Sequence, residues 1–410
     1  MGFSRRGTPT SIPPIAAFWL LATLSCLLPA CTSRPAGRGE AAASAGPGES
    51  VDTGTLRLLG AAAFPPAALS VAGEPRVGSL SGVAFDPQSS QWVAVSDDTA
   101  RPRFVWMDIA MGPTLTIVPR RFTFLQAGAG VRADLLAGLD MEALAPLPDG
   151  GFAVTNEGYI DRLGVAHQPA VLFVQRDGTV TAVVHPREHY TITPADSTRG
   201  VRHNLGLESL TRTPDGRLMT GLEQPLAQDG PMSNGSRGAV VRLQEFLETR
   251  PGAPTPAWEP GREWAYQLEP TPAVAGYHRA CDDGENGLSE LLALSDVRLL
   301  AVERACLQGA PGLPAFNPVR IFEVTLDEAD DVSGLVSLEG RRPRPVRKRL
   351  VLDTATLAPR LPPLLATMSN FEALAFGPTG PRGERTVLLV SDDNFRATQT
   401  TAFLWLALDR

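Results

Sequence analysis

The sequence predicts an all-β fold, a β-propeller of five four-stranded antiparallel blades. One layout recurs five times: an apolar strand, a turn rich in Gly, Asp or Ser, and a second strand that ends on a charged residue, in most cases an acid. These hairpins occupy residues 81–98, 140–157, 204–224, 287–304 and 370–394. Repeated four-stranded units are typical of a propeller, whose blades leave no long free edge. Beyond the N-terminal leader, no long segment has the 3.6-residue period of a helix.

The strand-like runs between the hairpins complete the blades. They are residues 103–109 and 115–124, 170–175 and 180–185, 238–244 and 263–268, and 319–326 and 346–352. The last hairpin is followed by one such run (401–410), and the first is preceded by one (55–64). We therefore expect the N-terminal run to supply the fourth strand of the last blade and close the ring. The long insertions leave room for a sixth blade.

The N-terminus has the pattern of an export signal. Arg5 and Arg6 precede a short apolar run, which ends in "LPAC" at residues 28–31. This resembles a bacterial lipobox, so residues 1–31 are predicted to be a lipoprotein signal peptide, with cleavage before Cys31 and lipidation of its thiol. An ordinary signal peptide with an incidental cysteine is the alternative, and both Sec and Tat export remain open.

The residues after Cys31 define the rest of the organisation. Residues 32–53 are small, polar and rich in Gly and Pro, which predicts a flexible tether. Residues 54–410 then form the propeller domain. The expected location is the bacterial cell envelope (outer membrane, periplasm or cell surface), with the lipid anchor as the only membrane contact.

Charge and cysteine content narrow the partners and the compartment. The net charge of −7 disfavours nucleic acid as a partner. We expect a monomer whose partner is a small-molecule ester or phosphoester. After Cys26 and Cys31, only Cys281 and Cys306 remain. In an oxidising compartment, these two are predicted to form a disulfide.

Acidic residues are placed symmetrically about the hairpin turns. Glu142 and Glu157 flank a turn at 149–150, and Glu208 and Glu223 flank one at 215–216. Facing side chains of a two-residue hairpin lie about 5 Å apart, where like charges are destabilising unless a cation or a shared proton intervenes. The pattern recurs roughly in two more hairpins, as Glu290 with Glu303 and Glu372 with Asp392 or Asp393. The first hairpin has only outgoing acids, Asp97 and Asp98.

These acids are expected to converge at the mouth of the central channel. The start of an inner strand and the end of the following antiparallel strand lie on the same face of a propeller. Such a ring of carboxylates supplies oxygen ligands that suit Ca²⁺. Zinc is disfavoured, because the five histidines form no ligand-spaced cluster. Two other interpretations stay open. The acids could accept backbone N–H bonds and lock neighbouring blades together, or some could act directly in catalysis.

Other candidate catalytic residues are few. His203 and His278 stand just before inner strands, where each is a candidate general base or phosphate ligand together with Arg202 or Arg279. A purely structural histidine is the alternative for each. Arg304 follows Glu303 and could neutralise acids or counter substrate charge. No GxSxG motif supports a serine hydrolase.

Four motifs resemble the phytase-like family, also called the "esterase-like activity of phytase" domain. They are "DMEALAPLPDGGFAVTNEGY", "NLGLESL…LEQPL", "LLAVER" and "NFEALAFGP…LLVSDDNF…Q", which together cover about residues 75–407. The resemblance implies an exported propeller that hydrolyses phosphoesters or esters. The first hairpin departs from the pattern, because Ser81 and Gly82 stand where the others have an incoming acid.

Three functions are therefore considered. The first is a Ca²⁺-assisted hydrolase of phosphoesters or carboxylic esters, in which Arg202, Arg279 or Arg304 counters the substrate's charge. The second is a non-catalytic envelope propeller that binds a partner or a glycan and uses the acids as latches. The third is a metal-dependent sugar-lactone hydrolase.

Overall fold

The computed structural model describes residues 56–409 apart from 251–256, 281–285, 310–314 and 366–368. Residues 49–410 group into one compact unit. The predicted signal peptide with Cys31 and the whole predicted tether lie outside the described residues, as does Cys281. Cys306 lies between strands β19 and β20. Because Cys281 is outside the described residues, the bridge between the two cysteines stays a prediction.

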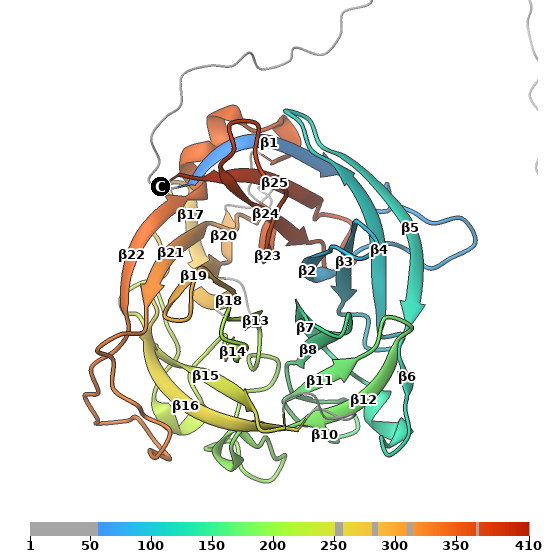
Figure 1. Cartoon of the computed structure of the whole chain (residues 1–410). Coiled ribbons are helices and arrows are strands. Elements are labelled where there is room, and N and C mark those ends of the chain that lie inside the picture. Colours follow the sequence, from blue (N-terminus) through green and yellow to red (C-terminus); the bar gives the residue numbers. More distant parts are fainter. Residues whose placement is uncertain (1–55, 251–256, 281–285, 310–314, 366–368, 410) are drawn as a thin grey trace, which may run out of the picture. The chain divides into compact units, whose positions relative to one another are not determined.

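Five antiparallel blades form a β-propeller, which confirms the predicted fold and blade count (Figure 1). From the centre outwards, blade 1 is β2 (Leu80–Asp86), β3 (Gln91–Ser96), β4 (Arg103–Ala110) and β5 (Thr116–Phe124). Blade 2 is β7 (Met141–Pro146), β8 (Phe152–Asn156), β11 (Ala170–Val174) and β12 (Thr179–Val184), with β6 (Gln126–Ala127) added in parallel at its outer edge. Blade 3 is β13 (Thr211–Arg212), β14 (Leu218–Gly221), β15 (Val240–Glu248) and β16 (Trp258–Gln267). Blade 4 is β18 (Asn286–Ala293), β19 (Arg298–Ala305), β21 (Val319–Thr325) and β22 (Arg347–Asp353).

Blade 5 joins the two ends of the domain. It consists of β23 (Asn370–Phe376), β24 (Arg385–Asp392), β25 (Thr401–Leu408) and, outermost, β1 (Leu56–Phe64). β1 pairs antiparallel with β25 from Leu56 opposite Leu408 to Phe64 opposite Thr401. Figure 1 shows β1 and β25 side by side, so the N-terminal strand closes the ring as predicted.

The hydrophobic core is divided among the interfaces between neighbouring blades. In β19, for example, Leu299 and Ala301 pack toward blade 3, whereas Leu300 and Val302 pack toward blade 5. All four side chains are fully buried. Side chains alternate between the two faces of a strand, and here both faces are covered. That explains why the inner strands are apolar at nearly every position.

The remaining described elements are short. They are the pairs β9 (Tyr159–Ile160) with β10 (Ala166–His167) and β17 (Tyr277–Ala280) with β20 (Leu307–Gly309). Single-turn or two-turn 3₁₀ helices are η1 (Ala133–Leu136), η2 (Glu188–Tyr190), η3 (Ala227–Asp229), η4 (Thr354–Arg360) and η5 (Pro363–Leu365). In the described part of the chain, none of the helices has the length and apolarity needed to cross a membrane.

Candidate functional site

A β-bulge near the start of the inner strand sets the geometry of each hairpin. In blade 2, Met141 pairs with Asn156, but Leu144 pairs with Val154, so the register shifts between them. The N–H of Glu157 is donated to the carbonyl oxygen of Asp140 at 2.9 Å. Asp140, not Glu142, therefore stands opposite Glu157, and the predicted direct pairing is wrong.

The same shift separates the other predicted pairs. Glu208 donates its N–H to the Gly221 carbonyl, and Glu223 donates to the Gly206 carbonyl, so these two acids are offset. In the remaining hairpins the direct partners differ again, with Val302 opposite Glu290, Leu288 opposite Glu303 and Asn370 opposite Asp392. Two one-residue offsets cause the error. The ladder beside the turn pairs Leu144 with Val154, which already places Glu142 level with Asn156, and the bulge shifts the pairing by one residue more.

Equivalent positions around the ring nevertheless carry acids. One such position lies at the end of the second strand of each hairpin. In blades 1 to 5 it is occupied by Asp97, Glu157, Glu223, Arg304 and Asp392. The position at the bulge of the inner strand is Ser81, Glu142, Glu208, Ser289 and Glu372. Arg304, and not Glu303, thus occupies the blade 4 position at which the other blades have an acid.

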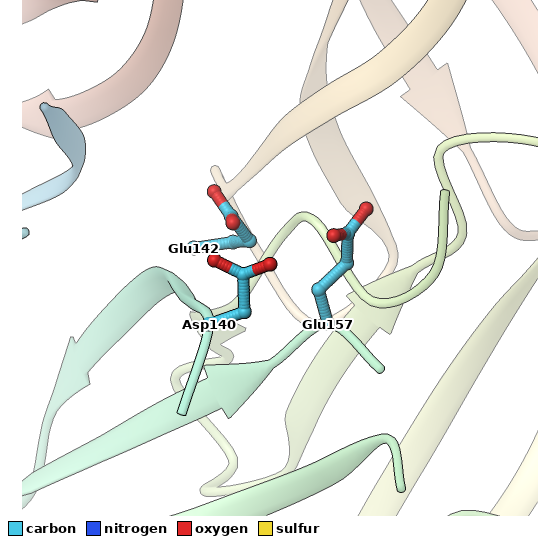
Figure 2. A group of neighbouring side chains, drawn as sticks. All are labelled: Asp140, Glu142 and Glu157. Carbon is cyan, nitrogen blue, oxygen red and sulfur yellow. The ribbon is translucent and has the colours of Figure 1, made fainter. Parts of the chain in front are cut away.

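We call these acids, together with Asp140, the carboxylate ring. Its members are Asp97, Asp140, Glu142, Glu157, Glu208, Glu223, Glu372 and Asp392. In two overlapping groups, Asp140–Glu142–Glu157 and Glu157–Glu208–Glu223, one oxygen from each residue lies within 4.8 Å of the others. Figure 2 shows the first group, with the three carboxyl groups on the same side of the inner edge of blade 2. Six of the eight predicted metal ligands therefore lie in the ring.

Arg304 places a positive charge beside this ring. One of its terminal nitrogens lies 3.1 Å from Glu223 and 3.0 Å from Glu372. Burial alone would lower the pKa of the guanidinium, but the carboxylates of Glu372 and Glu223 raise it above its ordinary value. Arg304 therefore stays charged and neutralises part of the ring, as the sequence suggested.

Six other ring members have a raised pKa, which favours their neutral, protonated form. Burial raises the pKa of Asp140 to about 7. Burial, together with the charges of neighbouring acids, raises the pKa of Asp97 to about 7. Burial, followed by repulsion from other ring members, raises the pKa of Glu142, Glu157, Glu208 and Asp392 well above the ordinary range. A cation that enters the ring would displace protons from these groups.

One oxygen of the ring has no hydrogen-bond donor. Glu157 is fully buried, and its Oε1 accepts the N–H of Gly206 at 3.1 Å. Its Oε2 is buried without a hydrogen-bond partner. An unsatisfied buried carboxylate oxygen is costly. Glu157 belongs to both three-acid groups, and Glu208 is the neighbouring acid with which it can share a proton. The donor set is made of oxygen atoms alone, so it fits a hard cation such as Ca²⁺.

Glu290 and Glu303 lie outside the ring. Glu290 is buried, and its Oε1 accepts N–H bonds from Leu291 at 2.9 Å and from Leu210 of blade 3 at 3.0 Å. It has the geometry expected of a latch between blades. Glu303 binds the Tyr266 hydroxyl at 2.8 Å and Lys348 Nζ at 2.5 Å, so its charge is compensated elsewhere.

The predicted histidines differ in how far the structure places them. His203 is exposed, and its Nδ1 accepts the N–H of Ile160 at 3.1 Å. Arg202 beside it donates to the carbonyl oxygens of Pro225 and Gly230, so its guanidinium holds the loop. His278 and Arg279 lie in β17, and their side chains are outside the described part of the structure.

Three polar residues of this region were not among the predicted site residues. Asp140 and Asp97 belong to the ring, and the acid at the start of "DMEALAPL" was the available signal for the first. The third is Tyr159. Burial, and then the charge of the neighbouring Asp140, raise the pKa of Tyr159 above its ordinary value. Its ring stacks on His167 at 4.6 Å between ring centroids. No spacing rule in the sequence singles out a lone tyrosine.

Comparison with solved structures finds other proteins that align over most of the chain. They include the PQQ-bound aldose sugar dehydrogenase of Streptomyces coelicolor (13% identity, 88% of this chain and 99% of that chain, TM-score 0.35). An endo-arabinase of Bacteroides thetaiotaomicron aligns at 10% identity (85% and 98%, TM-score 0.40). A gluconolactonase of Xanthomonas campestris also aligns at 10% identity (84% and 97%, TM-score 0.28). At these scores the likeness carries no argument about function.

The family comparison is more specific. No curated protein matches the chain. The family model described as "Phytase-like: Esterase-like activity of phytase" matches residues 75–395. That match spans most of the chain, including all five inner strands and the whole carboxylate ring. The chain therefore belongs to the phytase-like family.

Proposed function

We propose that this protein is an exported hydrolase of phosphoesters or carboxylic esters that acts at the carboxylate ring with a bound divalent cation, Ca²⁺ in the first instance. The observation that carries the proposal is the convergence of five buried acids in two groups that share Glu157, with one oxygen of each residue within 4.8 Å of the others in its group. Membership of a family described by an esterase-like activity supports the reaction class.

The roles of the residues follow from their positions. Asp140, Glu142, Glu157, Glu208 and Glu223 would hold the cation. When bound, such an ion polarises an ester oxygen and lowers the pKa of a water molecule. The protein itself would keep the site compact, because Arg304 compensates Glu223 and Glu372.

Proton transfer would fall to residues at the rim. Asp97, a ring acid outside the two groups that would hold the cation, has its pKa raised to about 7 by burial and neighbouring acids, so it can hold or release a proton at neutral pH. Tyr159 keeps its proton at neutral pH, because its pKa is raised, and so it can donate a hydrogen bond. His203, exposed on its loop, remains a candidate base.

The first experiment measures the effect of calcium on the domain of residues 49–410 by thermal melting and calorimetry. Calcium at about 100 times its dissociation constant should add about 2.7 kcal/mol to the free energy of unfolding. Glu142→Gln and Glu208→Gln should abolish this gain, whereas Glu323→Gln, far from the ring in β21, should keep it. If calcium has no effect and the ring variants are merely less stable, the non-catalytic envelope propeller is the better explanation.

Activity is tested separately, with carboxylic esters, phosphomonoesters and sugar lactones. Hydrolysis that requires calcium and is lost in Glu142→Gln supports the proposal. Turnover of lactones alone would instead support the sugar-lactone hydrolase. Calcium binding without any turnover would leave a metal-stabilised binding module and contradict the proposed catalytic function.

We also propose that the domain is held at the bacterial envelope by a lipid on Cys31. The support is the lipobox-like "LPAC" at residues 28–31. Cys31→Ser should move the protein from the membrane fraction to the soluble fraction of the producing cells. Retention of the variant in the membrane fraction would contradict the anchor.

A further inference from the structure

A cavity of about 370 Å³ lies beside the carboxylate ring, where the chain leaves β3 of blade 1. Asp97, a member of the ring, forms part of its wall. The other residues that matter here are Arg76, Asp98, Arg101, Arg103 and Phe395. Three guanidinium groups thus stand next to a cluster of acids, in a chain whose net charge is −7.

Two of these arginines are fixed by carboxylates. Arg103 is buried and lies 2.5 Å from Asp98. Arg76 lies 2.6 Å from Asp393 and also donates to the carbonyl oxygen of Phe395 at 2.9 Å. Both guanidinium groups therefore build the wall of the cavity and have little freedom to move.

Arg101 is different, because most of its hydrogen-bonding capacity is unused. Its side chain is 57% exposed, and its nearest carboxylate, Asp98, is 3.8 Å away and already bonded to Arg103. Asp98 and Asp393 are paired closely with Arg103 and Arg76, so Arg101 is the guanidinium of this wall without a close ion pair. An exposed guanidinium with free N–H groups is suited to bind an oxyanion with two hydrogen bonds.

The backbone at and next to the wall of the cavity is held in an unfavourable conformation. Phe395, in the wall, has φ of 49°, and the nearby Asn394 and Ser79 have φ of 46° and 51°, values that non-glycine residues rarely adopt. Asp393 maintains this arrangement, because its Oδ1 accepts the N–H groups of Ser79 at 2.8 Å and of Phe395 at 3.1 Å. Such strain is concentrated at functional sites and persists only where the surroundings impose it.

Phe395 gives the cavity an apolar surface between the charges. The Arg76 guanidinium carbon lies 5.3 Å from the centre of its ring, and that of Arg103 lies 5.9 Å away. The cavity therefore offers an aromatic face, one available guanidinium and direct access to a ring acid. A small organic group that ends in an oxyanion matches all three features.

We propose that this cavity, the arginine pocket, binds a phosphate or carboxylate group that the substrate carries in addition to the ester that is cleaved. The inference rests on the proposed function and narrows its substrate class to anionic esters. It also explains how an anionic substrate is accepted beside a ring of acids: Arg101 attracts the distal anion while the ester reaches the ring.

Two esters with the same leaving group provide the kinetic test. 4-Nitrophenyl hexanoate is neutral, whereas mono-4-nitrophenyl adipate has the same chain length and carries a terminal carboxylate. The domain of residues 49–410 should prefer the adipate ester. Arg101→Ala should raise KM for the adipate ester about five- to tenfold and leave the hexanoate ester unchanged. Arg162→Ala, an exposed arginine in the β9–β10 turn, is the matched control and should change neither ester.

Direct binding separates the pocket from the reaction. Calorimetry with adipate, with and without calcium chloride, and with inorganic phosphate in calcium-free buffer, should show binding that Arg101→Ala weakens and Arg162→Ala does not. A stronger signal for phosphate would assign the pocket to phosphorylated substrates. Binding without hydrolysis of either ester would support the pocket and contradict only the proposed function. Equal treatment of both esters, together with no binding of either anion, would overturn the arginine pocket.

Discussion

At the scale of single residues, Arg304 decides how much negative charge the ring can hold. It takes the blade 4 position that is acidic in the other four blades, and it contacts Glu223 and Glu372. Removing it would leave two buried acids without their cation. At low pH these acids can take up protons, but at high pH they cannot do so without cost.

Arg304→Met should therefore destabilise the calcium-free domain in a pH-dependent way. We expect a loss of about 3 kcal/mol in the free energy of unfolding at pH 8 and a clearly smaller loss at pH 5. Urea denaturation at both pH values measures it. Arg298→Met, which removes an exposed arginine paired with Glu323, should cost less than about 1 kcal/mol at either pH. Equal losses at both pH values for Arg304→Met would contradict this role.

At the scale of elements, the bulge in each inner strand determines which side chains reach the ring. Together with the register beside the turn, the one extra residue places Glu142 at the bulge and makes Asp140 the direct partner of Glu157. In blade 4 the corresponding bulge residue is Ser289, and Glu290 points to backbone amides. Two glutamates that look alike in the sequence thus have different surroundings.

Substitution of Glu290 tests its assignment as a latch. Glu290→Ala should lose about 2–4 kcal/mol of stability, because the buried N–H groups of Leu210 and Leu291 lose their acceptor. Burial raises the pKa of Glu290, so the side chain resembles a neutral amide. Glu290→Gln should accordingly cost less than about 1 kcal/mol.

The calcium affinity of the same variants distinguishes a latch from a ligand. Calorimetry should give an unchanged calcium dissociation constant for Glu290→Gln. A loss of calcium binding in Glu290→Gln as large as that in Glu208→Gln would place Glu290 among the ligands instead.

At the scale of the whole molecule, closure of the ring depends on one N-terminal strand. β1 covers the outer edge of β25 over the full length of blade 5. Without it, β25 would be an unpaired edge strand of the kind that promotes aggregation. Buried β1 residues such as Leu56 and Ala62 would also leave the cores on both sides of the blade.

A chain that begins at residue 66 should therefore melt at a much lower temperature and aggregate, whereas a chain that begins at residue 54 should behave like the longer domain. Circular dichroism melts and light scattering measure both properties. A cooperative melt of the shorter chain at an unchanged temperature would show that ring closure contributes little.

The ring as a whole should also make stability depend on pH. The pKa of Asp97 and Asp140 rises from an ordinary 3.8 to about 7, so between these values the folded state binds more protons than the unfolded state. The stability that these groups contribute is complete below pH 3.8 and is lost as pH rises through 7. The calcium-free domain should therefore lose stability from pH 5 to pH 8 through this ring.

Asp140→Asn should reduce that loss, and Asp327→Asn, an exposed aspartate after β21, should not. Melting temperatures in chelator across the pH range provide the measurement. With calcium, the wild-type domain should instead become more stable as pH rises. Calcium binds the ionised ring acids and takes the place of their protons. A pH profile that Asp140→Asn leaves unchanged would rule out control by the ring.

The sequence by itself determined the strands, the five-fold repeat, the closing strand and the acids that gather at one end, because alternation and turn chemistry are local properties. It also carried the family motifs, which the match to residues 75–395 confirmed. Only the tertiary structure decided the register within each hairpin. The register beside the turn and the one-residue bulge leave no mark in the periodicity, yet together they place Asp140 instead of Glu142 opposite Glu157. In blade 4 they place Arg304 instead of Glu303 beside the ring and leave Glu290 as a latch. The arginine pocket is likewise a tertiary feature, because Arg76 and Phe395 come from opposite ends of the domain and meet only when the ring closes.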